Sequence, residues 1–167
     1  MTRIVNVASS VEGSRRSVEL ADKYDMVYAT VGVHPHEAGS VTDSVISDLK
    51  LLAKSGKVVA IGEVGLDYYR CLTPKEAQGA VFKRFIHLAL DLDLPLIIHA
   101  READRDTLDS IKRESPRGLR GVMHCFSGSS DFMKECLDLG LFISFTANLT
   151  FKKADNLRMV ARDIPPE

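Results

Sequence analysis

The chain has 167 residues, 45% of them hydrophobic and 27% charged, and a formal net charge of −1. These values are ordinary for one soluble globular domain with a real core. They exclude a broad basic surface for nucleic acid, so any such binding would depend on a few phosphate contacts and metal ions. The sequence has no apolar run near the roughly 18–20 residues that a membrane span needs, which predicts no membrane partner.

The cysteines and the first residues indicate the cellular compartment. Cys71, Cys125 and Cys136 are odd in number and lack C-x-x-C spacing, which argues against a disulfide framework. The opening MTRIVNVASS has no charged leader followed by a long apolar stretch. The predicted location is therefore the cytoplasm.

Apolar strands alternate with amphipathic helices along the chain. We expect strands at 4–8, 26–33, 57–62, 94–98, 120–123 and 141–145, and helices at 14–24, 42–54, 74–90, 103–114, 130–139 and 154–162. Thr73-Pro74-Lys75-Glu76 reads as a capping box, and Ser130 as the cap of a later helix that Gly140 ends.

This alternation predicts an α/β fold with a parallel sheet. Two architectures fit it, a doubly wound open sheet and a (β/α)8 TIM-type barrel. The open sheet would favour a glycine-rich phosphate loop after the first strand, but Val11-Glu12-Gly13-Ser14 holds one glycine. The barrel predicts polar ligands at the carboxyl ends of several strands, and the sequence matches that pattern better.

Glu63, His99 and His124 each follow an apolar run that reads as a strand. Any one of them alone could be an exposed or hydrogen-bonded residue at the rim of the sheet. Together they favour a metal centre, because imidazole and carboxylate suit zinc and related divalent ions. Such an ion lowers the pKa of bound water toward about 7 and so supplies a nucleophile for hydrolysis.

Four further side chains could meet an anionic substrate. His34 and His36 flank Pro35 after the second expected strand, and such a pair can ligate a metal or contact phosphate. Arg101 could hold a phosphate bidentately or pair with a nearby acid. Ser127 precedes a helix amino terminus, which is a natural anion site or an ordinary cap.

Other polar residues near these motifs have less specific readings. Asp67, Tyr68 and Tyr69 could line a pocket or pack at the rim. Cys125 has no base and orienting partner beside it in the sequence, so we expect a small packed residue and not a nucleophile.

Five segments together resemble the TatD family of metal-dependent deoxyribonucleases: GVHPHEA, IGEVGLDYYR, LPLIIHAREA, HCFSGS and SFTANLTFKKADNLR. The resemblance covers essentially all 167 residues. It implies a (β/α)8 fold of the amidohydrolase-like group and a cytoplasmic two-metal phosphodiesterase, with 3′–5′ exonuclease activity on DNA in several members. Zinc, magnesium or manganese would be the cofactor, and single-stranded DNA or DNA 3′ ends the substrate.

The resemblance also implies roles for individual residues. Glu63 would be a bridging metal ligand that positions the attacking water, and His99 and His124 would complete one metal site. His34, His36 and Arg101 would lie near the scissile phosphate.

The sequence departs from the family pattern at both ends. Members usually open with a strand ending in His-x-His and continue into a strand ending in Thr-Asp-Ala-Pro, whose Asp is a metal ligand and general base. We find neither, so we expect one domain over residues 1–167 that is truncated at both ends, with about six of eight βα units. Such a chain would hold one of two metals, have little nuclease activity and could self-associate through open sheet edges.

Two alternative functions remain open at this stage. The metal site could hydrolyse an ester or amide, as in aminoacyl-tRNA deacylation. The chain could also be catalytically inactive and act only in binding or assembly.

Overall fold

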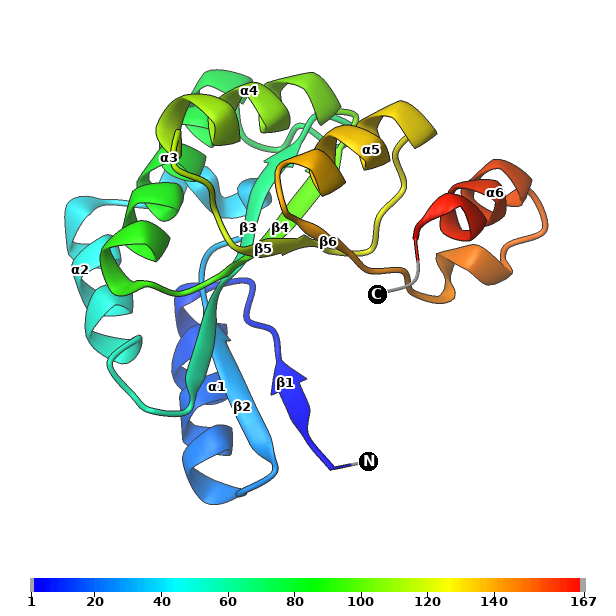
Figure 1. Cartoon of the computed structure of the whole chain (residues 1–167). Coiled ribbons are helices and arrows are strands. Elements are labelled where there is room, and N and C mark those ends of the chain that lie inside the picture. Colours follow the sequence, from blue (N-terminus) through cyan, green and yellow to red (C-terminus); the bar gives the residue numbers. More distant parts are fainter. Residues whose placement is uncertain (1, 166–167) are drawn as a thin grey trace.

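The computed structural model describes residues 2–165 as one curved sheet with helices packed on it (Figure 1). Six parallel strands pair in the order β1-β2-β3-β4-β5-β6. The elements are β1 (Ile4–Asn6), α1 (Val11–Lys23), β2 (Val27–Val31), the 3-10 helix η1 (Pro35–Ser40), α2 (Asp43–Leu52), β3 (Val58–Asp67), α3 (Lys75–Leu92), β4 (Leu96–Arg101), α4 (Asp104–Glu114), β5 (Gly121–Met123), α5 (Ser130–Asp138), β6 (Phe142–Ile143), the 3-10 helix η2 (Ala147–Thr150) and α6 (Asp155–Asp163).

The strand order decides between the two predicted architectures. A doubly wound sheet reverses its order at a switch point, whereas these strands follow the order of the chain from one edge to the other. Figure 1 shows α1 to α5 on the outer side of the curved sheet. The barrel-type prediction is confirmed, and residues 2–165 form six of its βα units.

The main core lies between the sheet and these helices. Phe82, Phe85 and Ile86 on one face of α3 are fully buried against β3 and β4, where Ile61 and Ile98 are also fully buried. The helical spacing of apolar residues on α3 and their alternation on the strands therefore direct both sets of side chains into one core layer between helix and sheet.

The opposite face of the sheet carries a hollow of about 420 Å³. Its lining is mostly apolar and includes Val59, Ile97, Val122 and the exposed Phe142. No helix within residues 2–165 is both long and apolar enough to cross a membrane.

Two strands extend further than the sequence predicts. We expected the third and fourth strands to end at residues 62 and 98, but β3 reaches Asp67 and β4 reaches Arg101. Glu63 and His99 therefore lie within strands and not after them. In β3 the apolar run of the sequence ends at residue 62, because in the segment 63–67 only the alternate residues Val64 and Leu66 belong to the hydrophobic core.

Two helix caps also differ from the prediction. Pro74 occupies the cap position of α3, and Thr73 donates its hydroxyl hydrogen bond to the backbone carbonyl of His36. The prediction of a capping box at Thr73 is wrong, because its hydroxyl bonds to η1 and does not cap α3. At α5 the capping side chain is Ser129, one residue before the predicted Ser130, and it accepts from the amide of Phe132.

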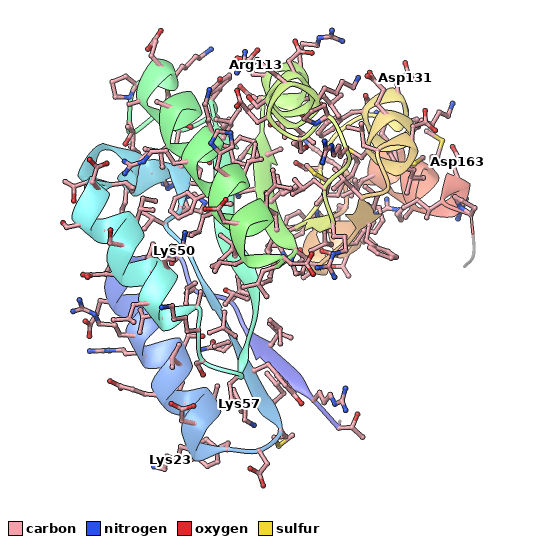
Figure 2. All side chains as sticks on the ribbon, turned by 60° about the vertical axis from the view of Figure 1, so that its left-hand side comes forward. Lys23, Lys50, Lys57, Arg113, Asp131 and Asp163 are labelled. Atoms are coloured by element: carbon pink, nitrogen blue, oxygen red, sulfur yellow. The ribbon has the colours of Figure 1, made fainter. Side chains whose placement is uncertain are left out.

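The amino ends of the strands lie at one end of the molecule, opposite the predicted site. Figure 2 shows Lys23 and Lys57 at this end, where β2 and β3 begin. Tyr24 follows Lys23 and is about half exposed. Residues there provide controls for substitutions at the other rim.

Gly65 allows the close approach of β3 and β4. It pairs with His99 at a φ of +142°, and an added Cβ would overlap the carbonyl oxygen of His99. Gly65→Ala should lower the free energy of unfolding by about 3 kcal/mol or more, measured by urea denaturation.

Gly56→Ala is the matched control, because an added Cβ there meets nothing within 4 Å. We expect it to change stability by at most about 0.5 kcal/mol. Equal stability of the two variants would contradict this account of the β3–β4 contact.

Candidate metal centre

The pairing of β3 with β4 builds the centre. Gly65 lies opposite His99 in the parallel register. Since side chains alternate along a strand, Glu63 and Asp67 are on the same face as Gly65, two residues before and after it. The missing side chain of Gly65 therefore leaves the imidazole of His99 between two carboxylates.

Both ring nitrogens of His99 meet carboxylate oxygens. Nδ1 lies 3.0 Å from Glu63 Oε1, and Nε2 lies 3.1 Å from Asp67 Oδ2. Ionised carboxylates only accept hydrogen bonds, so this geometry favours the protonated ring, in which both nitrogens donate. Burial alone would lower the pKa of His99, but the hydrogen bonds and charges of Glu63 and Asp67 outweigh it and raise that pKa.

His34 completes a cluster of three ligand-type side chains. Ligand atoms of His34, Glu63 and His99 all lie within 4.8 Å of one another. The rings of His34 and His99 meet edge to face with centroids 4.4 Å apart. Burial, and then the positive charge of His99, lower the pKa of His34 to about 4, so this ring is neutral at pH 7.

Asp67 is a buried carboxylate that orients two imidazoles. Its Oδ2 lies 2.9 Å from His36 Nε2 as well as 3.1 Å from His99 Nε2, and its Oδ1 accepts from the amide of Arg70 at 2.8 Å. Burial opposes ionisation, but these hydrogen bonds lower the pKa of Asp67 overall. Gln78 of α3 fixes the backbone at this point, since its amide group bonds both the N–H and the carbonyl of Asp67.

The backbone around Glu63 is held by the first two strands. Its N–H donates to the carbonyl of Ala8 at 2.6 Å. The buried hydroxyl of Thr30 donates to the carbonyl of Gly62 at 2.5 Å and accepts from the amide of Ala8 at 2.9 Å. Burial opposes ionisation of Glu63, but the hydrogen bond with His99 and the charges of nearby histidines lower its pKa.

The predicted third ligand, His124, lies close by but outside the cluster. It follows β5, and its N–H donates to the carbonyl of Ile98 at 2.8 Å. Its electrostatic interaction with Glu63 is one of the causes that lower the pKa of that carboxyl. In residues 2–165 the three-residue group contains His34 in its place. The ligand role of His124 stays a prediction.

The two other residues predicted to contact substrate share a neighbouring cleft. Arg101, the last residue of β4, and Ser127, before α5, both line a cleft of about 340 Å³. His36, by contrast, is turned toward Asp67 in the cluster itself.

The sequence patterns did not indicate that Asp67 orients two histidines, or that the hydroxyl of Thr30 links the backbones of Ala8 and Gly62. A signal for Asp67 exists, because it is four residues after Glu63 and a continued strand would put both on one face. Because the predicted strand ended at residue 62, Asp67 was not recognised as sharing a face with Glu63. Nothing in the sequence indicates the partners of Thr30.

The cluster fits a divalent cation by the chemistry of its donors. Two imidazoles and one carboxylate form a ligand set that zinc and similar ions accept. Each metal-bound imidazole must present an unprotonated nitrogen, so the raised pKa of His99 opposes metal binding at low pH.

Comparison with known proteins gives the family. The sequence matches the TatD related DNase family over residues 1–167. It is 39% identical over 163 residues to the metal-dependent hydrolase YabD of Bacillus subtilis, covering 98% of this chain and 64% of that protein. The chain belongs to the TatD related DNase family. It is also 38% identical over 133 residues to the family member named 3′–5′ ssDNA/RNA exonuclease TatD of Klebsiella pneumoniae, covering 80% and 51% of the two chains.

Solved structures of the family agree with the fold. The TatD homologue YJJV of Escherichia coli superposes with a TM-score of 0.90 at 30% identity, covering 99% of this chain and 64% of that one. A TatD family hydrolase of Entamoeba histolytica gives 0.88 at 29% identity, with 99% and 57% covered. This chain therefore spans somewhat under two thirds of the length of these family members.

The charges of the cluster can be tested in the metal-free chain by NMR titration. His34 should titrate near pH 4 and His99 above its ordinary value of 6.5. Asp67→Asn should lower the pKa of His99, because it removes a negative charge that stabilises the imidazolium.

The control is Asp131→Asn on the exposed start of α5 (Figure 2), which should leave the pKa of His99 unchanged. A His34 transition at or above 6.5, or no response of His99 to Asp67→Asn, would contradict this description.

Proposed function

We propose that this protein is a metal-dependent phosphodiesterase that acts on single-stranded nucleic acid, most specifically as a 3′–5′ exonuclease of DNA. The observation that carries the proposal is the convergence of His34, Glu63 and His99 within 4.8 Å. The names of two relatives support the substrate class: the Klebsiella pneumoniae exonuclease and a human 3′–5′ RNA nuclease, TATDN2, that is 40% identical over 148 residues.

Each residue of the centre has a proposed role in binding the cation or the substrate. His34, Glu63 and His99 would hold a divalent cation, with His124 as a further ligand and Glu63 as the carboxylate that could bridge two ions. When bound, such a cation supplies Lewis-acid activation of water and of a phosphoryl oxygen. Zinc, manganese and magnesium all suit a set that includes a carboxylate.

Orientation of the ligands would depend on Asp67. Its Oδ2 lies 3.1 Å from His99 Nε2, and the other ring nitrogen, Nδ1, lies 3.0 Å from Glu63 Oε1 and would be the one to hold a cation. A carboxylate in this position selects the tautomer and raises the basicity of a ligand histidine. His36, held by the same carboxylate, would present its remaining ring edge toward a substrate phosphate.

Substrate contacts would extend from this centre along β4. Arg101 lies two residues beyond His99 on the same strand, and Ser127 faces the same cleft. A guanidinium and a hydroxyl can both donate hydrogen bonds to the non-reacting part of a nucleotide.

Metal binding tests the ligand assignment without catalysis. Titration of the purified chain with Zn²⁺ or Mn²⁺ in a calorimeter should show binding that releases protons and weakens as the pH falls. Glu63→Gln and His99→Ala should each weaken binding at least about 100-fold.

His87→Gln provides the control, because His87 is a half-exposed histidine paired with Glu114 on the outer side of α3. Unchanged affinity in both Glu63→Gln and His99→Ala would contradict the proposed centre.

Hydrolysis tests the reaction itself. A 3′-labelled and a 5′-labelled single-stranded oligonucleotide are incubated with protein in excess, so that slow turnover is measurable. We expect Mn²⁺-dependent shortening from the 3′ end, stopped by EDTA and lost in Glu63→Gln because the carboxylate ligand is gone. His87→Gln should retain the rate. Metal binding with no hydrolysis, or hydrolysis that survives EDTA, would contradict the proposed function.

A further inference from the structure

An exposed aromatic–cation stack lies beside the metal centre. The guanidinium carbon of Arg101 lies 3.8 Å from the centroid of the Tyr69 ring. Tyr69 is 56% exposed and Arg101 is also exposed. Both residues line the cleft of about 340 Å³, so the stack is presented to whatever occupies that cleft.

The strand register places this stack next to the ligands. Asp67 pairs with Arg101, and Arg101 follows His99 by two residues on the same face of β4. Two residues along a strand span about 7 Å. A molecule held at the metal centre would therefore extend onto the Tyr69–Arg101 stack.

The stack forms one wall of the 340 Å³ cleft, and the charges of that cleft discriminate between the parts of a nucleotide. The other lining residues are Glu102, Asp104, Ser127, Gly128 and Ser129. Two carboxylates against one guanidinium repel a phosphate. They do accept hydrogen bonds from the amino groups of bases.

Arg101 keeps its hydrogen-bonding capacity. Within residues 2–165 its guanidinium has no ion pair and no hydrogen bond, only the stacking contact with Tyr69. A guanidinium that is already held flat by a ring offers its donors at a low cost in side-chain entropy. Its plane and the ring of Tyr69 are both surfaces on which a base can stack.

We propose that this cleft binds one base of single-stranded nucleic acid, stacked on the Tyr69–Arg101 pair, with its edge toward Glu102 and Asp104. The inference rests on the proposed function for the class of substrate and adds which part of that substrate the cleft recognises. Arg101 thereby acts through stacking and base contacts, and the scissile phosphate lies on the side of His99.

Binding in EDTA tests this inference apart from hydrolysis. Fluorescence anisotropy is measured with a labelled eight-nucleotide oligo(dC), whose amino groups suit the two carboxylates, and with an abasic strand of equal length. Loss of one stacked base corresponds to a roughly tenfold loss of affinity. Tyr69→Ala should therefore bind oligo(dC) about tenfold more weakly, while Tyr69→Phe, which retains the ring, binds as the unaltered chain does.

A matched control exists at the opposite rim. Tyr24 is 48% exposed and lies under Lys23, whose ammonium is 5.4 Å from the ring centroid (Lys23 is labelled in Figure 2). Tyr24→Ala removes an equally exposed ring under a cation and should leave binding unchanged. The abasic strand should bind the unaltered chain and Tyr69→Ala with equal, weak affinity.

The outcomes separate the two claims. Equal affinity of the unaltered chain and Tyr69→Ala for oligo(dC), equal affinity for the abasic strand and oligo(dC), or no measurable binding of oligo(dC) overturns the base cleft even if hydrolysis is observed. If the expected Tyr69 dependence is found but Mn²⁺ gives no hydrolysis, the base cleft is supported and the phosphodiesterase assignment fails.

Discussion

The parallel pairing of β3 with β4 is the constraint on which the rest of the centre depends. It sets Gly65 against His99, and so brings the carboxylates of Glu63 and Asp67 to the two nitrogens of one imidazole. The same register sets Asp67 against Arg101 and thereby positions the rim of the cleft. A slip of one residue would turn both carboxylates into the helix-facing core. The apolar alternation of Val64 and Leu66, which are buried there, opposes such a slip and protects the centre.

Charge compensation explains why so many ionisable groups can share a partly buried place. An isolated carboxylate or imidazolium would be costly there, and each lowers the cost of the other. The result is a set of paired charges: the carboxylates raise the pKa of His99, the histidines help to lower the pKa of Glu63 and Asp67, and burial and then the charge of His99 lower the pKa of His34. A divalent cation would supply positive charge to the same carboxylates that raise the pKa of His99. The charges as well as the donor atoms of the centre therefore fit a divalent cation.

Much of the architecture can be derived from the sequence: alternation of apolar strands with helices predicts a parallel sheet, and polar residues at the ends of several strands favour the barrel, whose strands follow chain order. The motif around Glu63 and the run before His99 indicate ligands on adjacent strands for the same reason. The sequence left His34 open as a metal ligand or a phosphate contact, and only the three-dimensional structure brings it within 4.8 Å of Glu63 and His99. The role of Asp67 was concealed differently, because Gly62 and Gly65 interrupt the apolar pattern of one continuous strand. Polar and glycine positions on the ligand face are what make the end of that strand resemble a loop.

Gln78 of α3 hydrogen-bonds both ends of the loop that connects β3 to α3. Its buried amide bonds the backbone of Asp67 at one end of the connection to α3 and the carbonyl of Thr73 at the other. Both ends of this connection are thus anchored by a helix side chain. Tyr69 lies between them with an exposed side chain, so it can be exchanged while Gln78 still holds the backbone of Asp67. Substitution here could therefore change the cleft while leaving the candidate metal centre unaltered.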